Sequence, residues 1–583
     1  MQRSAAFRWS AALLIVVAGW TTLSSCGKKS SSDGSGAAPD VADLSEPGLD
    51  LSGGDATTPG GTGGDGGVFT SRSDRAFVVT PDPAPAPPAA AGVVNTVTDL
   101  DSDRVFSGTT EITGRITTAG AGGVRSITVN GGDLLISGSI ERTDPGGGFS
   151  FSASGILQVT GSIQTSGGPV TLKSGGPIDV RGTIETNGSG VVSDADGAHG
   201  GSGGAISIEG SGSVVVAGSM RFRGGRARTS GAGAVGGDGG RFLLRGTTVA
   251  LFGSLDGRGG NASAKAEGTG VHGGRGGRIT IGDSTPVTSV TFRKGRFASG
   301  GGAGDRTGGR GGSFDLLAGT EGMDLDGTFA VEGGSSPTTG GAGGLFKAQC
   351  DVVGGDLRSG ATVMVSGGAG GTGGAGGRID LSAWFDPSAS SGGSGGSILL
   401  SPSSVLTADG GSSSGASAAG KGGTIHLEIP EARVSISGLV AARGGGAHGS
   451  GPGGLGGFLW VASDANANAL GGDIVVESGA MLDASGGSSA SGAGGDAQWS
   501  TTPDMFNPEV IPLAVLFDGD SVFGGPNAGA LIQNNGTVVA RGGRPGGHGG
   551  DVYFHGRSAT TREPERGDVQ NDGEGGSGVF TSD

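Results

Sequence analysis

Residues 366–381 read SGGAGGTGGAGGRIDL, and this stretch decides the fold. Residues 367–378 form four Gly-Gly-X triplets, after which apolar residues alternate at Ile379 and Leu381. Taken alone, the stretch fits a flexible linker, a phosphate-binding loop or a turn in a repetitive scaffold. The way in which it recurs along the chain distinguishes among these three.

The stretch belongs to an internal repeat whose unit begins with GGxGG. Copies start at positions 200, 236, 273, 308, 340 and 373, so they are spaced by 36, 37, 35, 32 and 33 residues. Later copies start at positions 392, 420, 453 and 546, and a second signature, such as GSIQTSGG at Gly161 and GTFAVEGG at Gly327, recurs between them. A period of this size is the mark of a solenoid.

The residues after each GGxGG alternate between apolar and polar. Ile279 and Ile281 are an example, and we expect both to point inward while Arg278 and Thr280 point outward. The sequence therefore predicts an all-β parallel β-helix over residues 95–556, with two or three strands per coil. We expect the Gly-rich inserts to lie between strands and project from one side. Glycine suits them because tight turns use positive φ and stacked backbones approach closely.

Composition and charge set the organisation of the whole chain. Residues 26–94 are rich in Gly, Ser and Pro and predict a disordered tether, while residues 557–583 predict a polar C-terminal tail. The formal charge is −16, and cleavage after residue 25 removes Arg3 and Arg8, which gives −16 − 2 = −18. Such an acidic chain lacks the basic face that nucleic acid requires.

The N-terminus carries the pattern of a targeting signal. Residues 1–25 combine two arginines with the apolar run AALLIVVAGW, as in a secretory signal peptide that is too short to span a bilayer. The following Leu23-Ser24-Ser25-Cys26 resembles the lipobox of bacterial lipoproteins. The resemblance implies diacylglyceryl attachment at Cys26, cleavage before it, and an anchor in the cell outer membrane.

Other motifs that could mark a functional site are interpreted as structural features or chance matches. Gly415–Gly422 is similar to a phosphate-binding loop but lacks the Ser/Thr that holds Mg²⁺, and the sequence TIHLEI after it favours a strand. Of the GGxGG copies, only the one containing Asp551 fits a calcium repeat. The loop histidines fall in separate coils, Cys350 reads as a buried side chain, and we expect no cofactor and no metal. These histidines are His199, His272, His448 and His548.

The repeat region resembles bacterial surface proteins with Gly-rich parallel β-helices, of the filamentous-haemagglutinin and pectin-lyase-like type. That resemblance implies a non-catalytic structural or adhesive protein of the cell envelope, whose partners are the membrane and surface glycans or other envelope proteins. The alternative is a β-helical polysaccharide lyase or glycoside hydrolase. Asp324 and Asp326 alternate onto one strand face and could serve hydrolysis, although a solvated face gives the same pattern.

Overall fold

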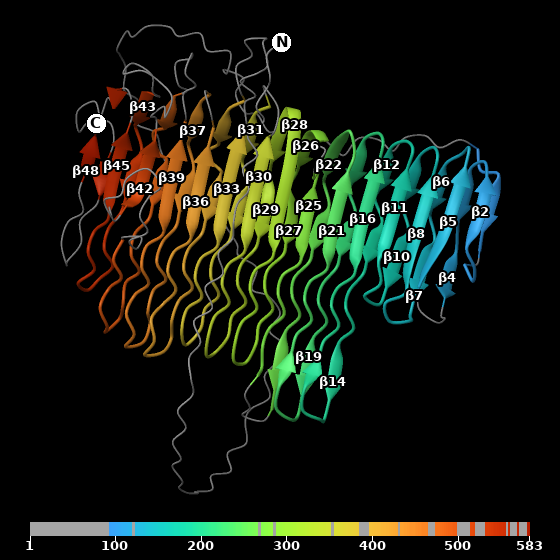
Figure 1. The fold of residues 1–583 in the computed structure, drawn as a ribbon, viewed down its shortest axis with the longest axis horizontal. Coiled ribbons are helices and arrows are strands. Elements are labelled where there is room, and N and C mark those ends of the chain that lie inside the picture. Colours follow the sequence, from blue (N-terminus) through green and yellow to red (C-terminus); the bar gives the residue numbers. More distant parts are fainter. Residues whose placement is uncertain are drawn as a thin grey trace, which may run out of the picture. The chain divides into compact units, whose positions relative to one another are not determined.

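The computed structural model describes residues 92–98, 100–118, 123–265, 270–283, 287–350, 355–383, 396–429, 432–463, 473–497, 513–518 and 531–555, and three further short strands. Every regular element in these residues is a β-strand, and every strand pairing is parallel (Figure 1). The chain is therefore all-β, as the sequence predicts. The predicted signal peptide, lipidation site and tether, residues 1–91, lie outside the described residues.

The largest sheet is made of two columns of strands, which adjoin because β28 belongs to both. The first column comprises β2 (Arg104–Ser107), β5 (Val124–Asn130), β8 (Gly148–Ala153), β11 (Val170–Ser174), β16 (Ala205–Gly210), β21 (Arg241–Arg245), β25 (Arg278–Ile281), β28 (Ser313–Leu325), β30 (Leu345–Cys350), β33 (Arg378–Ala383), β36 (Thr424–Glu428), β39 (Phe458–Ala462), β42 (Leu513–Asp518), β45 (Asp551–His555) and β48 (Phe580–Ser582). The second column comprises β1 (Asn95–Val97), β3 (Thr110–Ile112), β6 (Leu134–Ile136), β9 (Leu157–Val159), β12 (Ile178–Val180), β17 (Val214–Val216), β22 (Thr248–Leu251), β26 (Val287–Phe292), β28, β31 (Leu357–Ser359), β34 (Ile398–Leu400), β37 (Val434–Ile436), β40 (Ile474–Val476), β43 (Leu531–Asn534) and β46 (Ser558–Ala559).

A second sheet forms a third column of strands, each of which follows a strand of the second column along the chain. A repeat unit thus contributes one strand to each of the three columns and pairs in parallel with the units before and after it. The third column comprises β4 (Arg115–Thr118), β7 (Ser139–Arg142), β10 (Ser162–Thr165), β13 (Thr183–Glu185), β18 (Ser219–Arg221), β23 (Ser254–Asp256), β27 (Gly295–Ala298), β29 (Gly327–Ala330), β32 (Thr362–Met364), β35 (Val405–Thr407), β38 (Leu439–Ala441), β41 (Met481–Asp483), β44 (Thr537–Val539) and β47 (Asp568–Gln570).

The apolar core lies between the columns and is built from the alternating positions. Ile279 pairs with Phe242 on one side and Phe314 on the other, and both Ile279 and Ile281 are fully buried. Arg278 is exposed and Thr280 is partly exposed. The predicted inward and outward faces are confirmed, and identical positions of successive units stack on one another.

Pairing continues beyond residue 556, where the sequence predicts that the repeat region ends. β47 pairs with β44, and β48 pairs with β45. β46 also lies beyond residue 556 and pairs with β43. The residues of these three strands therefore belong to the last repeat units, whereas the rest of the predicted tail lies outside the described residues.

From the unit that contains β13 onward, two Gly-rich arms extend the repeat units beyond their strands. The outgoing arm follows the third strand, as in residues 222–225, and the return arm is the GGxGG segment before the next first strand, as in residues 236–240. Facing arms are joined by an unbroken series of backbone hydrogen bonds of 2.7–2.9 Å, in which each N–H donates to the C=O of the residue before it in the series. The series runs through Ser189, Gly201, Gly225, Gly237, Gly260, Gly274, Gly302, Gly309, Gly334, Gly341, Gly368, Gly374, Gly411, Gly420, Gly445, Gly454, Gly487, Gly495, Gly543 and Gly547.

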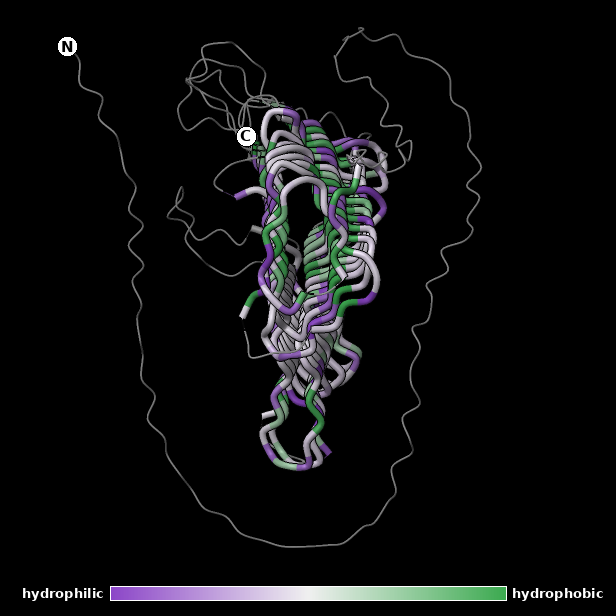
Figure 2. Tube along the Cα trace, turned by 90° about the vertical axis from the view of Figure 1, so that its right-hand side faces the viewer, coloured by the Kyte–Doolittle hydropathy of each residue, from purple (hydrophilic) through white to green (hydrophobic). Residues whose placement is uncertain are grey.

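The hydrogen bonds of the arms explain why the Gly-Gly-X pattern repeats every three residues. In the return arm of residues 273–277, Gly274 and Gly277 donate across to the outgoing arms, Gly273 and Gly276 donate to the next return arm, and Arg275 is exposed. This is a three-residue periodicity, as in polyproline II helices. In Figure 2 these arms are the pale segments that run close together. The opening stretch is thus neither a linker nor a phosphate loop: it comprises an outgoing arm, a tip and a return arm.

Apart from Gly546, whose φ is positive, the glycines in the arms are required by close approach and not by positive φ. A Cβ on Gly274 would lie 1.9 Å from the carbonyl oxygen of Gly237, and no glycine of residues 367–377 has positive φ. Glycines with positive φ lie instead at turns, for example Gly233 and Gly270 near the tips. The expectation that tight turns demand glycine in the triplets is therefore wrong, and the expectation of close backbone contact is confirmed.

Candidate functional site: an arginine-lined groove

The described part of the chain is hollowed on the outer side of the outgoing arms. Two adjoining hollows, with volumes of about 680 and 490 Å³, share Arg226, Asn261, Ala303, Ser335 and Ala369 in their linings. We call the two together the groove. Because the shared residues belong to successive repeat units, the groove runs along the direction in which the units stack.

The groove results from unequal tip lengths. In three successive units the tips are long and form a small additional sheet of β14 (Val191–Ser193), β19 (Ala227–Thr229) and β24 (Ala262–Ala264), accompanied by β15 (Ala198–His199) and β20 (Ala234–Val235). In the units that follow, the tip is as short as the residues between Gly302 and Gly309. Residues of β19 and β24 line the larger hollow, so the long tips form its wall. Figure 1 shows β14 and β19 lying beyond the other strands.

The floor of the groove is a column of small or short polar side chains. Backbone N–H groups bond to the next unit at 2.9 Å from Ala262 to Ala303, at 3.2 Å from Gly304 to Ser335, and at 3.0 Å from Gly370 to Ser412. These bonds place the floor residues one above another, at the spacing of about 4.8 Å that separates paired strands. The column consists of Asn261, Ala303, Ser335, Ala369 and Ser412.

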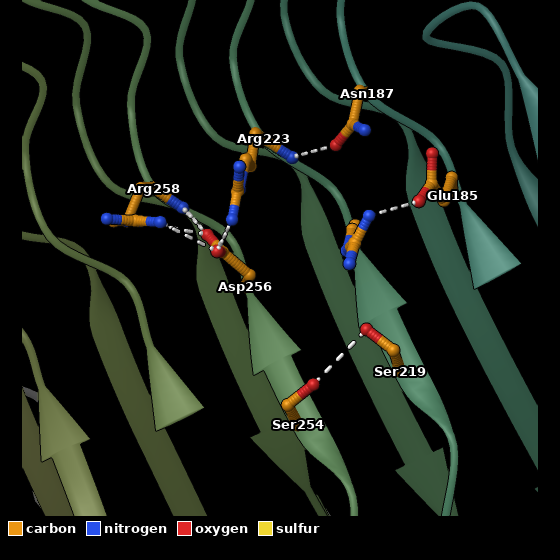
Figure 3. A network of polar contacts seen from close by, with 8 residues as sticks. Glu185, Asn187, Ser219, Arg223, Ser254, Asp256 and Arg258 are labelled. Atoms are coloured by element: carbon orange, nitrogen blue, oxygen red, sulfur yellow. Dashed lines mark hydrogen bonds and ion pairs between the residues drawn. The ribbon is translucent and has the colours of Figure 1, made fainter. Parts of the chain in front are cut away.

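At one end of the groove, Asp256 organises two arginines (Figure 3). Its carboxylate accepts a hydrogen bond from Nη2 of Arg223, and bonds of 3.2 and 3.1 Å from Nε and Nη2 of Arg258. Burial would raise the pKa of Asp256, but the hydrogen bonds from both arginines outweigh it and hold the pKa below the usual value. Asn187 Oδ1 accepts the backbone N–H of Arg223 at 3.0 Å and fixes the start of that arm.

The lowered pKa of Asp256 predicts a stability that depends on pH. The group stabilises the fold above its unfolded pKa, near 3.8, and the contribution is lost as pH falls through the lower folded value. We therefore expect Asp256→Asn to lower the urea midpoint at pH 7 and to lower it less at pH 2.5, measured by circular dichroism. The control, Asp315→Asn, breaks an exposed pair with Arg278 and is expected to change little at either pH. An equal loss for Asp256→Asn at both pH values would contradict this prediction.

Three other arginines of the groove form no ion pair within the described residues. Within the described chain, no carboxylate lies within ion-pair distance of Arg226, Arg228 or Arg296, and all three are exposed. Glu332 also lines the groove and is partly buried. Burial raises its pKa, and the charge of Arg296 only partly opposes that shift.

The groove is positively charged on an acidic protein. The described residues that line the two hollows include five arginines against Asp305 and Glu332, which gives 5 − 2 = +3, or +2 with Asp256 beneath them. The whole chain carries −16. A local field of opposite sign to the rest of the surface selects for anionic ligands.

The candidate site residues predicted from the sequence are not those of the groove. Cys26 lies outside the described residues. Cys350 is fully buried, as predicted, and burial, with a contribution from Asp356, raises its pKa to about 12. Asp324 forms an ion pair of 3.2 Å with Arg293, which identifies that face as a solvated, charge-paired strand surface.

The histidines and the possible calcium position do not converge. His199 and His272 are separated by Val235 in the pairing of the tips. Within the residues that the structure describes, which include Asp551, no group of three His, Cys, Asp or Glu side chains could hold a metal ion. Strand β36 follows Gly415–Gly422, as predicted. In the same residues, no helix has the length and apolarity needed to cross a membrane.

The groove arginines were not singled out from the sequence. The signal was present in RFRGGRARTS, residues 221–230, where four arginines lie in eight positions of a chain that is otherwise acidic. The triplet periodicity determines which of these arginine side chains point outward from the arm. That orientation can be recognised only in the folded arms.

Comparisons with known proteins give no further guide. No family model matches the chain, and neither a curated protein nor a solved structure matches it significantly.

Proposed function

We propose that the chain is a lipid-anchored, non-catalytic protein of the cell envelope, with a structural or adhesive role. In this proposal the stacked repeat units of residues 95–556 form a parallel β-helix. Cys26 carries the lipid, the anchor lies in the outer membrane, and residues 26–94 hold the β-helix away from the membrane.

The arginine-lined groove is the observation that supports an adhesive role most directly. It is open, crosses several repeat units, and combines exposed guanidinium groups with a floor of small side chains. Such a surface binds an extended ligand at many weak contacts. The bonded arms beneath it hold the floor in place, so little ordering is required on binding.

A polysaccharide lyase or hydrolase is the second candidate. Glu332 favours it, because a groove carboxyl group whose pKa is raised by burial is suited to proton transfer. Release of reducing ends from an acidic polysaccharide by the wild-type protein, abolished by Glu332→Gln, would assign catalysis to the groove and overturn the non-catalytic proposal.

The anchor is tested at Cys26. We expect Cys26→Ser to abolish incorporation of labelled palmitate and to release the protein from the membrane fraction, because only a cysteine sulfur forms the thioether. Cys350→Ser is the matched control, since Cys350 is the other cysteine of the chain and is buried in the core. Equal labelling of Cys26→Ser and wild type would refute lipidation at this position.

The adhesive role is tested on cells. Wild-type cells are expected to bind to immobilised envelope or matrix material, and cells that produce Cys26→Ser are expected to lose this binding while secreting folded protein. Undiminished binding by the Cys26→Ser cells would refute the anchored adhesin.

A further inference from the structure

We propose that the groove binds a carboxylate-bearing polysaccharide, with Arg226, Arg228 and Arg296 as ligands for its carboxylate groups. The inference specifies the ligand class for the proposed function. It depends on that proposed function only for the place where the protein encounters the ligand. It is carried by the placement of three guanidinium groups, which have no ion-pair partner among the described residues, around a floor of small side chains.

The arginines set the charge of the ligand. A guanidinium group presents a planar fork of donors that matches a carboxylate with two parallel hydrogen bonds. Asp256 already takes up donors of Arg223 and Arg258, whereas the exposed Arg226, Arg228 and Arg296 have no carboxylate within ion-pair distance in the described chain. The ligand is therefore expected to supply anionic groups at both the long-tip wall and the strand side of the groove.

The floor sets the shape of the ligand. From Asn261 to Ser412 the column rises through four steps of about 4.8 Å, which gives an open length of roughly 19 Å. Asn261 Oδ1 already accepts the backbone N–H of Ala303 at 2.9 Å, so Asn261 offers its amide NH2 group. Ser335 and Ser412 offer hydroxyl groups further along the column, and Ala303 and Ala369 leave room for close approach. A ribbon-like chain rich in hydroxyl groups, lying parallel to the stack, fits this column.

The floor does not suit an added peptide strand. Strand addition requires free backbone groups at a sheet edge. Here the N–H groups of Ala262, Gly304, Ser336 and Gly370 already donate to the next repeat unit. The floor therefore offers side chains and not a backbone ladder to its ligand.

The groove does not suit a nucleic acid either. The described residues of its lining include no aromatic side chain on which bases could stack. The chain as a whole carries −16, which opposes a densely charged phosphate backbone more strongly than a polysaccharide of lower charge density.

The test uses purified full-length protein in detergent and polygalacturonate as the probe. The triple variant Arg226→Ala/Arg228→Ala/Arg296→Ala is expected to raise the Kd at least about tenfold, and added salt is expected to weaken wild-type binding. The control is Arg275→Ala/Arg306→Ala/Arg310→Ala, which removes three exposed arginines from return arms and tips and the same charge. We expect it to change the Kd less than about twofold. Thermal melts of both variants verify the fold.

Ligand class is tested with three further probes. Fully methyl-esterified polygalacturonate keeps the sugar chain without its charge, polyglutamate keeps the carboxylates on a peptide, and oligothymidylate offers phosphates. Weak binding of all three supports the inference. Equal loss of polygalacturonate binding in both triple variants, unchanged binding in the groove variant, or tighter arginine-dependent binding of polyglutamate or oligothymidylate would each overturn it. The proposed anchoring fails separately, if a protein that binds the glycan as expected is found free in the medium.

Discussion

Replacing Ile279 with aspartate is expected to destabilise the repeat region by about 4 kcal/mol or more. Ile279 is fully buried between Phe242 and Phe314, so the new carboxylate would have no cation and no water beside it. Because each repeat unit is stabilised by its neighbours, we expect the units before and after it to loosen as well. Urea denaturation followed by circular dichroism, with limited proteolysis to map the loosened units, measures the effect.

Thr280→Asp is the matched control on the opposite face of the same strand. Thr280 is partly exposed, and a surface change of this kind costs within about 0.5 kcal/mol. Asp315 is its cross-strand neighbour, and repulsion between the two carboxylates adds at most about 1 kcal/mol. If both variants lost the same stability and protease resistance, the assignment of inward and outward faces would be wrong.

Gly274→Ala is expected to cost about 2–3 kcal/mol, although alanine ordinarily stabilises a chain relative to glycine. The added Cβ would lie 1.9 Å from the carbonyl oxygen of Gly237, and backbone atoms cannot yield as the end of a side chain can. The two successive return arms would have to separate, which strains the bonds that Gly274 makes to Gly260 and Gly302 in the outgoing arms. The urea midpoint and the exchange of the arm amide hydrogens report the two consequences.

Arg275→Ala controls for Gly274→Ala at the next residue of the same arm. Arg275 is exposed at the X position of its triplet, and we expect its loss to cost within about 0.5 kcal/mol. Amide protection of Gly237, Gly260 and Gly302 should fall in Gly274→Ala and stay at the wild-type level in Arg275→Ala. Unchanged protection in Gly274→Ala would show that the facing arms do not depend on glycine at that position.

The sequence predicts the strands well because their information is local. Alternation at Ile279 and Ile281 places two side chains on one face, and the spacing of the GGxGG copies aligns Phe242, Ile279 and Phe314 in one column. Burial of Cys350 follows from the same alternation. Each of these predictions needs only the two-residue period of a strand and the length of one repeat.

The groove could not be predicted in the same way, because it depends on differences between repeat units. Its wall exists because the tip after Gly225 is long, while the floor is open because the tip after Gly302 is short. Arg226 and Arg296 are far apart along the chain and line one hollow only once the units are stacked. The sequence predicts close backbone approach at the glycines but not the arms themselves, since a Gly-Gly-X run is as typical of turns as of two closely bonded arms.

The triplet geometry of the arms constrains how such a chain can change its length during evolution. Contacts across the arms recur every third residue, as at Gly274 and Gly277, so inserting a single residue would turn an X side chain toward the facing backbone. Whole triplets added to both arms of one unit would preserve the contacts but leave the neighbouring units shorter. We therefore expect insertions and deletions to be tolerated at the tips and excluded from the arms, so that the proposed binding surface can diversify at the tips.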